Sequence, residues 1–172
     1  MKTVIAAMLC TAVASLLSTN ASAVTVHHVT NGNAAGVCAA AFSDQVVRNR
    51  PTGVRNTGTA AIYVTCSVPG DAQGSKATST YIRVANFGTG SQTVSCNFQP
   101  GFTNSTDGTT YQGSFGKSIL LTANAYNWLT FTATDYPATS AFGFQNANFT
   151  CLLQPNTEIQ YIGFESDVEV GS

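Results

Sequence analysis

The stretch Ile62-Tyr63-Val64-Thr65-Cys66-Ser67-Val68 alternates between core-forming and more polar residues along its whole length. The stretch Val94-Ser95-Cys96-Asn97-Phe98 has the same alternation, and Phe149, Cys151 and Leu153 share one parity further along the chain. A period of two is typical of a β-strand with one buried face. These segments therefore predict three strands whose cysteines point inward together with the core residues.

Further strand-like segments, with turn-forming residues between them, lie on both sides of these three. The expected strands are Val24–Val29, Ala60–Val68, Ser79–Phe87, Gln92–Phe98, Thr109–Phe115, Lys117–Thr122, Tyr126–Ala133, Ala141–Leu153 and Thr157–Val170. Only Ala34–Val47 leaves room for a short helical turn, around Ala39-Ala40-Ala41. About nine strands in one domain predict an all-β fold, a two-sheet antiparallel sandwich of the jelly-roll or immunoglobulin-like kind, with a barrel as the alternative. We recognise no internal repeat.

The N-terminus has the three parts of a secretory signal peptide. Lys2 supplies a positive charge, Thr3–Leu17 is almost wholly apolar, and Ala21-Ser22-Ala23 places small residues at a cleavage site. We expect cleavage after Ala23, which leaves residues 24–172 as a single domain with no membrane-inserted segment. The protein is then secreted or periplasmic.

Four of the five cysteines lie after this segment. An even number in a chain sent to an oxidising compartment predicts two disulfides. We favour the pairs Cys38 with Cys66 and Cys96 with Cys151, because sequential pairing closes an N-terminal loop separately from the C-terminal sheet. The chain has no C-x-x-C pair, so the cysteines predict no metal site.

Composition and motifs exclude several classes of function. Charged residues make up 9% of the chain and the formal net charge is −1, which does not fit a nucleic-acid-binding protein. The two histidines, His27 and His28, are strand neighbours and are expected to point to opposite faces. No nucleophile, phosphate-binding or metal-binding motif is present. We therefore expect no cofactor, no metal and no enzymatic activity.

The last expected strand carries a row of acids. Glu165, Asp167 and Glu169 alternate with other residues and so share one face. A divalent cation could bind such a row, but the favoured interpretation is a solvated outer face. A carboxylate-dependent hydrolase stays open as a third-ranked alternative, because that chemistry needs only two acids at the right separation.

One strand also predicts an exposed aromatic surface. Leu129 and Phe131 have the parity of core residues, which leaves Tyr126, Trp128 and Thr130 on the opposite face. An exposed tyrosine and tryptophan two residues apart could stack on sugar rings or fill a partner's pocket. The alternative is that another strand or loop covers them. These three residues are our candidate ligand-binding residues.

A second segment, Arg48-Asn49-Arg50-Pro51-Thr52-Gly53-Val54-Arg55, concentrates positive charge. It could contact an acidic partner or a sulfated glycan. The favoured interpretation is a solvated loop.

The strands together resemble a protein family. The segments Tyr63–Pro69, Ile82-Arg83-Val84, Val94-Ser95-Cys96 and Phe149–Pro155, followed by Tyr161 and Glu165, are similar to a group of secreted bacterial β-sandwich proteins with disulfides and no assigned activity. The resemblance covers roughly Ala60 to Val170 and rests on strand, cysteine and turn features. It implies the fold and carries over no catalytic residue.

Three classes of function remain, in order of preference. The first is a secreted, non-enzymatic binding module of unidentified ligand, with a carbohydrate as the candidate ligand, and it predicts an exposed platform at Tyr126 and Trp128. The second is a structural or assembly subunit of a cell-surface or extracellular structure, which pairs with a neighbouring chain, such as a cell-surface protein, at an uncovered sheet edge. The third is the hydrolase, which predicts two acids converging in a cleft.

Overall fold

The computed structural model describes residues 23–69, 76–103, 110–111, 114–135 and 146–170. Nearly all of the expected signal peptide lies outside these residues, so it stays a prediction. The start of the expected strand Ala141–Leu153 also lies outside them and stays a prediction. Residues His27–Val168 form one compact unit, and the described ends, 23–26 and 169–170, belong to a second. No helix among the described residues is long and apolar enough to cross a membrane.

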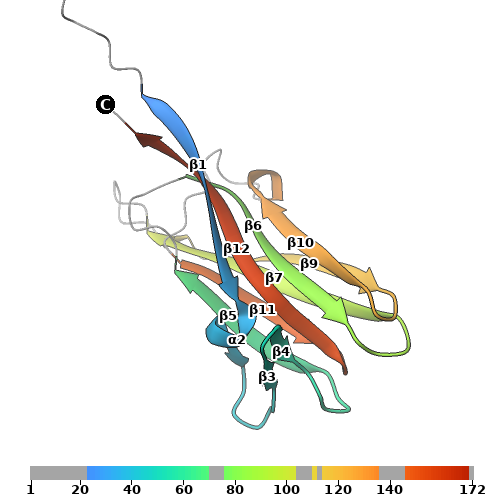
Figure 1. Ribbon diagram of the computed structural model, residues 1–172. Coiled ribbons are helices and arrows are strands. Elements are labelled where there is room, and N and C mark those ends of the chain that lie inside the picture. The colour runs from blue at the N-terminus through green and yellow to red at the C-terminus, as the bar shows by residue number, and fades with distance from the viewer. Residues whose placement is uncertain (1–22, 70–75, 104–109, 112–113, 136–145, 171–172) are drawn as a thin grey trace, which may run out of the picture. The chain divides into compact units, whose positions relative to one another are not determined.

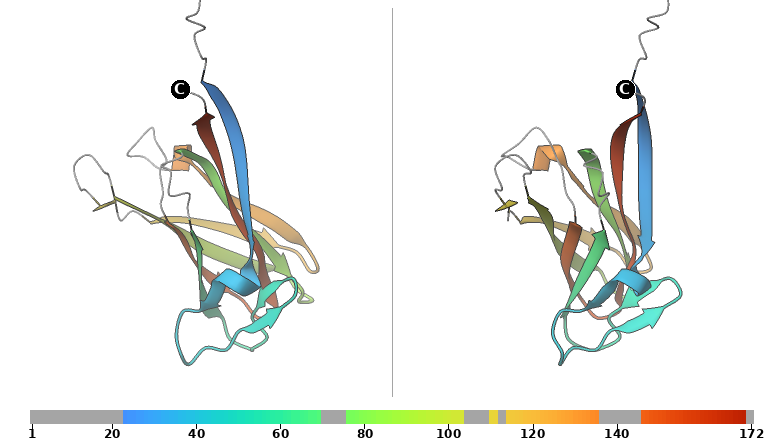
Figure 2. Two further views of the ribbon diagram at one scale, coloured as in Figure 1. Left: turned by 60° about the vertical axis from the view of Figure 1, so that its left-hand side comes forward. Right: turned by 90° about the vertical axis from the view of Figure 1, so that its left-hand side faces the viewer.

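The described strands form two antiparallel sheets, which confirms the predicted two-sheet sandwich (Figure 1). The first sheet has the order β10 (Tyr126–Thr132), β6 (Lys76–Asn86), β12 (Thr157–Val170), β4 (Gly53–Arg55) and β3 (Arg48–Arg50), and β1 (Val24–Asn33) also pairs with β12. The second has the order β2 (Cys38–Ala40), β5 (Ile62–Pro69), β11 (Asn146–Leu153), β7 (Gln92–Thr103) and β8 (Thr110–Tyr111), and β9 (Phe115–Leu121) also pairs with β7. Figure 2 shows the two layers from two other directions.

Each sheet has six strands in the described part of the chain, so the estimate of about nine strands was too low. The strands that the sequence did not show, β2, β3 and β4, are short, and three residues are too few to display an alternation. Arg48–Arg50 and Gly53–Arg55 are a hairpin in the first sheet, and the prediction of a loop there was wrong. β4 is ordered because it also pairs with β12.

The short helical turn is also displaced from its expected place. α2 covers Ala34–Val37 and begins after Asn33, whose side-chain oxygen accepts a hydrogen bond from the Ala35 N–H. This is the usual action of an asparagine at a helix N-cap. Ala39 and Ala40, where we left room for a helical turn, lie in β2 instead, and Ala41 follows it, because Cys38, Ala39 and Ala40 pair with β5.

The core lies between the two sheets of the 27–168 unit. All the core positions predicted from the alternation around Cys66, Cys96 and Cys151 that are described are buried. At the centre, Phe131 of the first sheet packs against Phe98 and Phe149 of the second, with ring centroids 5.1–5.8 Å apart among the three. The sheets are therefore joined by direct aromatic contact.

Two disulfides join Cys38 to Cys66 and Cys96 to Cys151, the pairs that we favoured. Within each pair the two residues stand directly opposite each other on neighbouring strands. The reason that we gave for the pairing was wrong, since β2, β5, β11 and β7 are consecutive strands of one sheet. Both bridges therefore cross-link the second sheet, and neither closes a separate N-terminal loop.

The structure also reveals an internal repeat that we did not recognise in the sequence. Two sets of six residues have the same identities and the same spacing along the chain. The first set is Val54, Asn56, Gly58, Thr59, Val64 and Cys66, and the second is Val84, Asn86, Gly88, Thr89, Val94 and Cys96. In both copies the chain leaves the first sheet, turns at a buried asparagine and enters the second sheet. The Asn56 side chain donates to Leu153 O and accepts from Gly58 N. Asn86 makes the equivalent bonds within its own turn and to Leu121 O.

Candidate functional site

The outer face of the first sheet displays the predicted aromatic residues. Tyr126 is 61% exposed and Trp128 is 43% exposed, and Thr130 beside them is also exposed. Leu129 and Phe131, which alternate with them, are buried in the core. Strand β10 therefore presents the three candidate residues to solvent, and their role in binding a ligand stays a prediction.

Neighbouring strands add further side chains to the same face. In the register of the sheet, Trp128 lies opposite Arg83 of β6, and Thr130 lies opposite Tyr81. Strand β12 continues both rows with Tyr161 beside Arg83 and a glycine beside Tyr81. Side chains that are far apart in the sequence are thus placed next to one another by the pairing of three strands.

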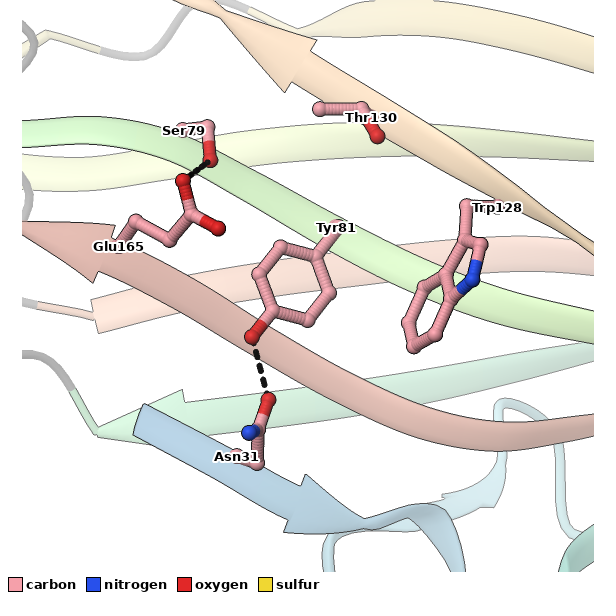
Figure 3. Close-up of a pocket in the computed structure, with 6 residues that line it drawn as sticks. All are labelled: Asn31, Ser79, Tyr81, Trp128, Thr130 and Glu165. Atoms are coloured by element: carbon pink, nitrogen blue, oxygen red, sulfur yellow. Dashed lines mark hydrogen bonds between the residues drawn. The ribbon is translucent and has the colours of Figure 1, made fainter. Parts of the chain in front are cut away.

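An open hollow of about 460 Å³ lies on this face (Figure 3). The residues that line it come from four strands and are Asn31, Ser79, Tyr81, Trp128, Thr130 and Glu165. The rings of Tyr81 and Trp128 meet edge to face, with centroids 5.3 Å apart. The sequence predicted Trp128 and Thr130 of this set and missed Tyr81, Ser79 and Asn31. Period-two alternation in the strand Ser79–Phe87 was the available signal for Tyr81.

Hydrogen bonds fix the polar groups in the hollow. The Tyr81 hydroxyl donates to Asn31 Oδ1, and Ser79 Oγ donates to Glu165 Oε2 over 3.0 Å. Burial raises the pKa of the Tyr81 hydroxyl above its usual value, and the negative charge of Glu165 adds to this, while the bond to Asn31 opposes it. Tyr81 therefore stays protonated at neutral pH and remains a hydrogen-bond donor.

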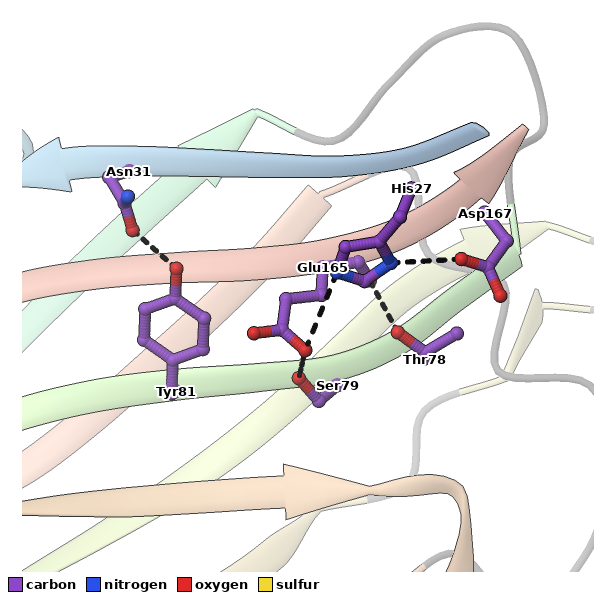
Figure 4. A network of polar contacts seen from close by, with 7 residues as sticks. All are labelled: His27, Asn31, Thr78, Ser79, Tyr81, Glu165 and Asp167. Carbon is purple, nitrogen blue, oxygen red and sulfur yellow. Dashed lines mark hydrogen bonds and ion pairs between the residues drawn. The ribbon is translucent and has the colours of Figure 1, made fainter. Parts of the chain in front are cut away.

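The acidic row continues beyond the hollow (Figure 4). His27 of β1 contacts Asp167 with 2.9 Å between Nδ1 and Oδ1, and its Nε2 lies 4.0 Å from Glu165 Oε2. The three side chains are about half exposed, so the pairs contribute little to stability. The Glu169 side chain lies outside the described residues. No group of three His, Cys, Asp or Glu side chains in the described part is placed to hold a metal ion.

Strand β10 is held in place by an ion pair at its end. Lys117 of β9 donates to the Thr130 carbonyl over 2.6 Å and to Asp135 Oδ2 over 2.7 Å. Burial raises the pKa of the Asp135 carboxyl, but hydrogen bonds from Lys117 and Thr132 outweigh it and bring the pKa below its usual value. Asp135 is therefore ionised at neutral pH and keeps Lys117 against β10.

Gly163 lies under the hollow, where a side chain would not fit. An added Cβ would lie 2.5 Å from Asn31 Oδ1, 2.6 Å from the Thr30 carbonyl oxygen and 2.7 Å from Tyr81 Cε2. The Tyr81 ring therefore covers Gly163 across the strand pair, an arrangement that protects the backbone of a strand glycine.

We expect Gly163→Ala to lower the free energy of unfolding by about 1–3 kcal/mol, because the neighbouring backbone and the Tyr81 ring would have to move. Urea denaturation of the two proteins measures the change. Gly90→Ala is the control, since nothing lies within 4 Å of an added Cβ there. Equal stability of Gly163→Ala and the unmodified protein would contradict the close packing under the hollow.

The basic segment contributes nothing to the lining of the hollow. Arg55 is committed elsewhere, since it pairs with Glu158 over 2.7 Å and its guanidinium lies 3.6 Å from the centroid of the Phe87 ring. Arg48 is exposed.

No protein-family model matches the chain, and no curated protein matches it by sequence. The resemblance to secreted bacterial proteins therefore stays a prediction.

Several solved structures are similar to the chain. The carbohydrate-binding module CBM36 in complex with calcium and xylotriose is 16% identical, with a TM-score of 0.42 over 78% of this chain and 98% of that chain. The CBM36-1 domain of a multidomain xylanase from the hindgut metagenome of Trinervitermes trinervoides is 12% identical, with a TM-score of 0.45 over 80% and 96%. The xylan-binding module CBM15 is 12% identical, with a TM-score of 0.45 over 82% and 97%. These likenesses are too distant to assign a function.

Proposed function

We propose that this chain is a non-catalytic, secreted carbohydrate-binding protein that holds a glycan on the outer face of its first sheet. The observation that carries the proposal is the hollow beside Trp128, where an aromatic ring stands next to hydroxyl, amide and carboxylate groups. Its volume of about 460 Å³ lies within the range of small-ligand sites, about 300–1,000 Å³.

The chemistry of this face matches that of a sugar. A sugar ring has apolar C–H faces, which pack on aromatic rings, and hydroxyl groups around its edge, which need donors and acceptors. Trp128 offers a ring surface, and Asn31, Thr130 and Glu165 offer amide, hydroxyl and carboxylate groups. An apolar ligand would exclude water from the remaining donors and acceptors of these groups without replacing those hydrogen bonds.

Secretion is part of the proposal and fits the two disulfides. Disulfides persist in oxidising compartments outside the cytoplasm. The Ala21-Ser22-Ala23 motif and the apolar segment before it support export. The protein would then meet polysaccharides outside the cell or in the periplasm.

Trp128→Ala tests the proposal. We expect it to weaken glycan binding by about thirtyfold or more, since a tryptophan at the centre of a binding site commonly contributes about 2 kcal/mol or more. A glycan array and polysaccharide pull-downs would first identify a ligand for the oxidised protein. Titration calorimetry would then compare the variants.

Tyr63→Ala is the matched control, because Tyr63 is 42% exposed but lies on the second sheet. It should bind as the unmodified protein does. Absence of any glycan binding, or equal loss in both variants, would contradict the proposal. A markedly lower melting temperature of Trp128→Ala would assign that residue to packing and favour assembly with a cell-surface protein.

A further inference from the structure

We propose that Arg83 makes this aromatic face selective for acidic glycans, by binding an anionic group of the sugar. The inference rests on the proposed function and names the class of glycan. The anionic group is a planar carboxylate of a uronic acid or a sulfate ester, since a guanidinium donates to either.

Arg83 lies among three aromatic rings. Its guanidinium carbon is 4.0 Å from the centroid of the Tyr126 ring, 5.7 Å from Trp128 and 5.8 Å from Tyr161. All three rings are exposed on the outer face of the first sheet. The guanidinium is therefore held, by stacking, at the surface where the glycan is proposed to lie.

Arg83 has a cationic group with no anionic partner. Its Nε is buried and makes no hydrogen bond, and no ion pair involves Arg83 among the described residues. By contrast, Arg55 and Lys117 are each paired with a carboxylate. Burying part of a cation without an anionic partner costs free energy. An anion that accepts hydrogen bonds from the remaining guanidinium N–H groups would therefore be bound favourably.

The charges on this face also set an orientation for the ligand. Glu165 and Asp167 lie toward the far end of the face, and Glu165 is four residues, or about 13 Å, along β12 from Tyr161. An anion would be repelled there and attracted at Arg83. The acidic sugar would then contact Arg83, Tyr126 and Tyr161, while neutral parts of the glycan lie over the hollow.

General attraction to polyanions does not account for such selectivity. The chain has a formal net charge of −1, so it would repel a polyanion weakly as a whole. A preference for charged over neutral polymers would therefore have to come from a local group.

The experiment compares matched polymers, namely polygalacturonate with its methyl ester and dextran sulfate with dextran. We expect the unmodified protein to bind the charged member of one pair about 10–100-fold more tightly at low salt. The pair that shows this ratio identifies carboxylate or sulfate as the group. The ratio should fall with added salt.

Variants assign the preference to Arg83. Arg83→Gln should bring the ratio close to one, and Arg83→Lys, which keeps the charge without the planar fork, should keep only part of it. Arg48→Gln is the control, because Arg48 is an exposed arginine on β3, at the opposite end of the first sheet's strand order from β10. It should keep the full ratio.

Several outcomes would overturn the inference. A ratio near one in the unmodified protein would do so even if glycan binding depends on Trp128, and the proposed function would then survive alone. An unchanged ratio in Arg83→Gln, with only a lower melting temperature, would show that Arg83 only stabilises the packing of the rings. No binding to any of the four polymers, in a protein that binds another glycan on the array, would overturn this inference and leave the proposed function standing. If Arg83→Gln does not fold, the ratios measured for the unmodified protein and for Arg83→Lys test the inference.

Discussion

Replacing Cys96 and Cys151 together by alanine is expected to lower the free energy of unfolding by about 4 kcal/mol. The bridge joins residues 55 positions apart, so its loss frees a long loop in the unfolded chain. It also removes two sulfur atoms from the core, where both cysteines are buried. Urea denaturation of the oxidised protein and the double variant measures the difference.

The second bridge is the matched comparison. Cys38 and Cys66 are only 28 positions apart, so the corresponding double variant should lose slightly less, about 3.5 kcal/mol. Both bridges link opposed residues on neighbouring strands of the same sheet, which keeps the local geometry comparable. A Cys96/Cys151 variant as stable as the unmodified protein would show that strand pairing alone holds this sheet.

Glu158→Gln is expected to lower the free energy of unfolding by about 3–5 kcal/mol. The Glu158 side chain is 0% exposed, and its Oε2 lies 2.7 Å from both Nε and Nη2 of Arg55. Thr52 donates to the other carboxylate oxygen over 2.8 Å. Glutamine would leave the largely buried Arg55 without its counter-charge and turn one acceptor into a donor. Chemical denaturation at neutral pH measures the loss.

A double variant separates the contribution of the ion pair from the cost of leaving one buried charge unpaired. Arg55→Met with Glu158→Leu removes both charges and should cost less than Glu158→Gln alone, because no buried charge is left unpaired. The loss of stacking between Arg55 and the Phe87 ring would account for part of the remaining cost. A double variant less stable than Glu158→Gln would mean that the ion pair itself is strongly stabilising.

These two structural features lie outside the lining of the candidate site. The Arg55–Glu158 pair ties β4 to the start of β12, the strand that further along carries Tyr161, Gly163 and Glu165. The disulfides stiffen the second sheet, against which the first sheet packs through Phe131. The proposed function needs such a rigid base, because aromatic stacking on a ligand depends on rings that are already in position.

Part of the site could be predicted from the sequence. Alternation within Tyr126–Phe131 separated Trp128 from the core correctly, because the two faces of a strand follow from the backbone geometry of that strand alone. Arg83 and Tyr81 could not be assigned to the same site. Their position beside Trp128 and Thr130 depends on the register between β6 and β10, which no pattern within either strand specifies.

The internal repeat shows a similar limit. Asn56 and Asn86 are ordinary turn residues in the sequence, and only their hydrogen bonds to carbonyls of distant strands explain why each is buried. The short strands β3 and β4 were missed for a related reason. These strands form because β4 pairs with β12, which is about a hundred residues away in the chain.

The sequence by itself determined the all-β class, the inward parity of Cys66, Cys96 and Cys151 and the outward parity of Tyr126, Trp128 and Thr130. Each of these follows from a period of two within one segment. Only the tertiary structure decided that Asn31, Tyr81 and Glu165 form a hollow with Trp128, and that Arg83 lies among three rings with no carboxylate partner among the described residues. Strand order and register bring these residues together, and both depend on contacts between segments far apart in the chain.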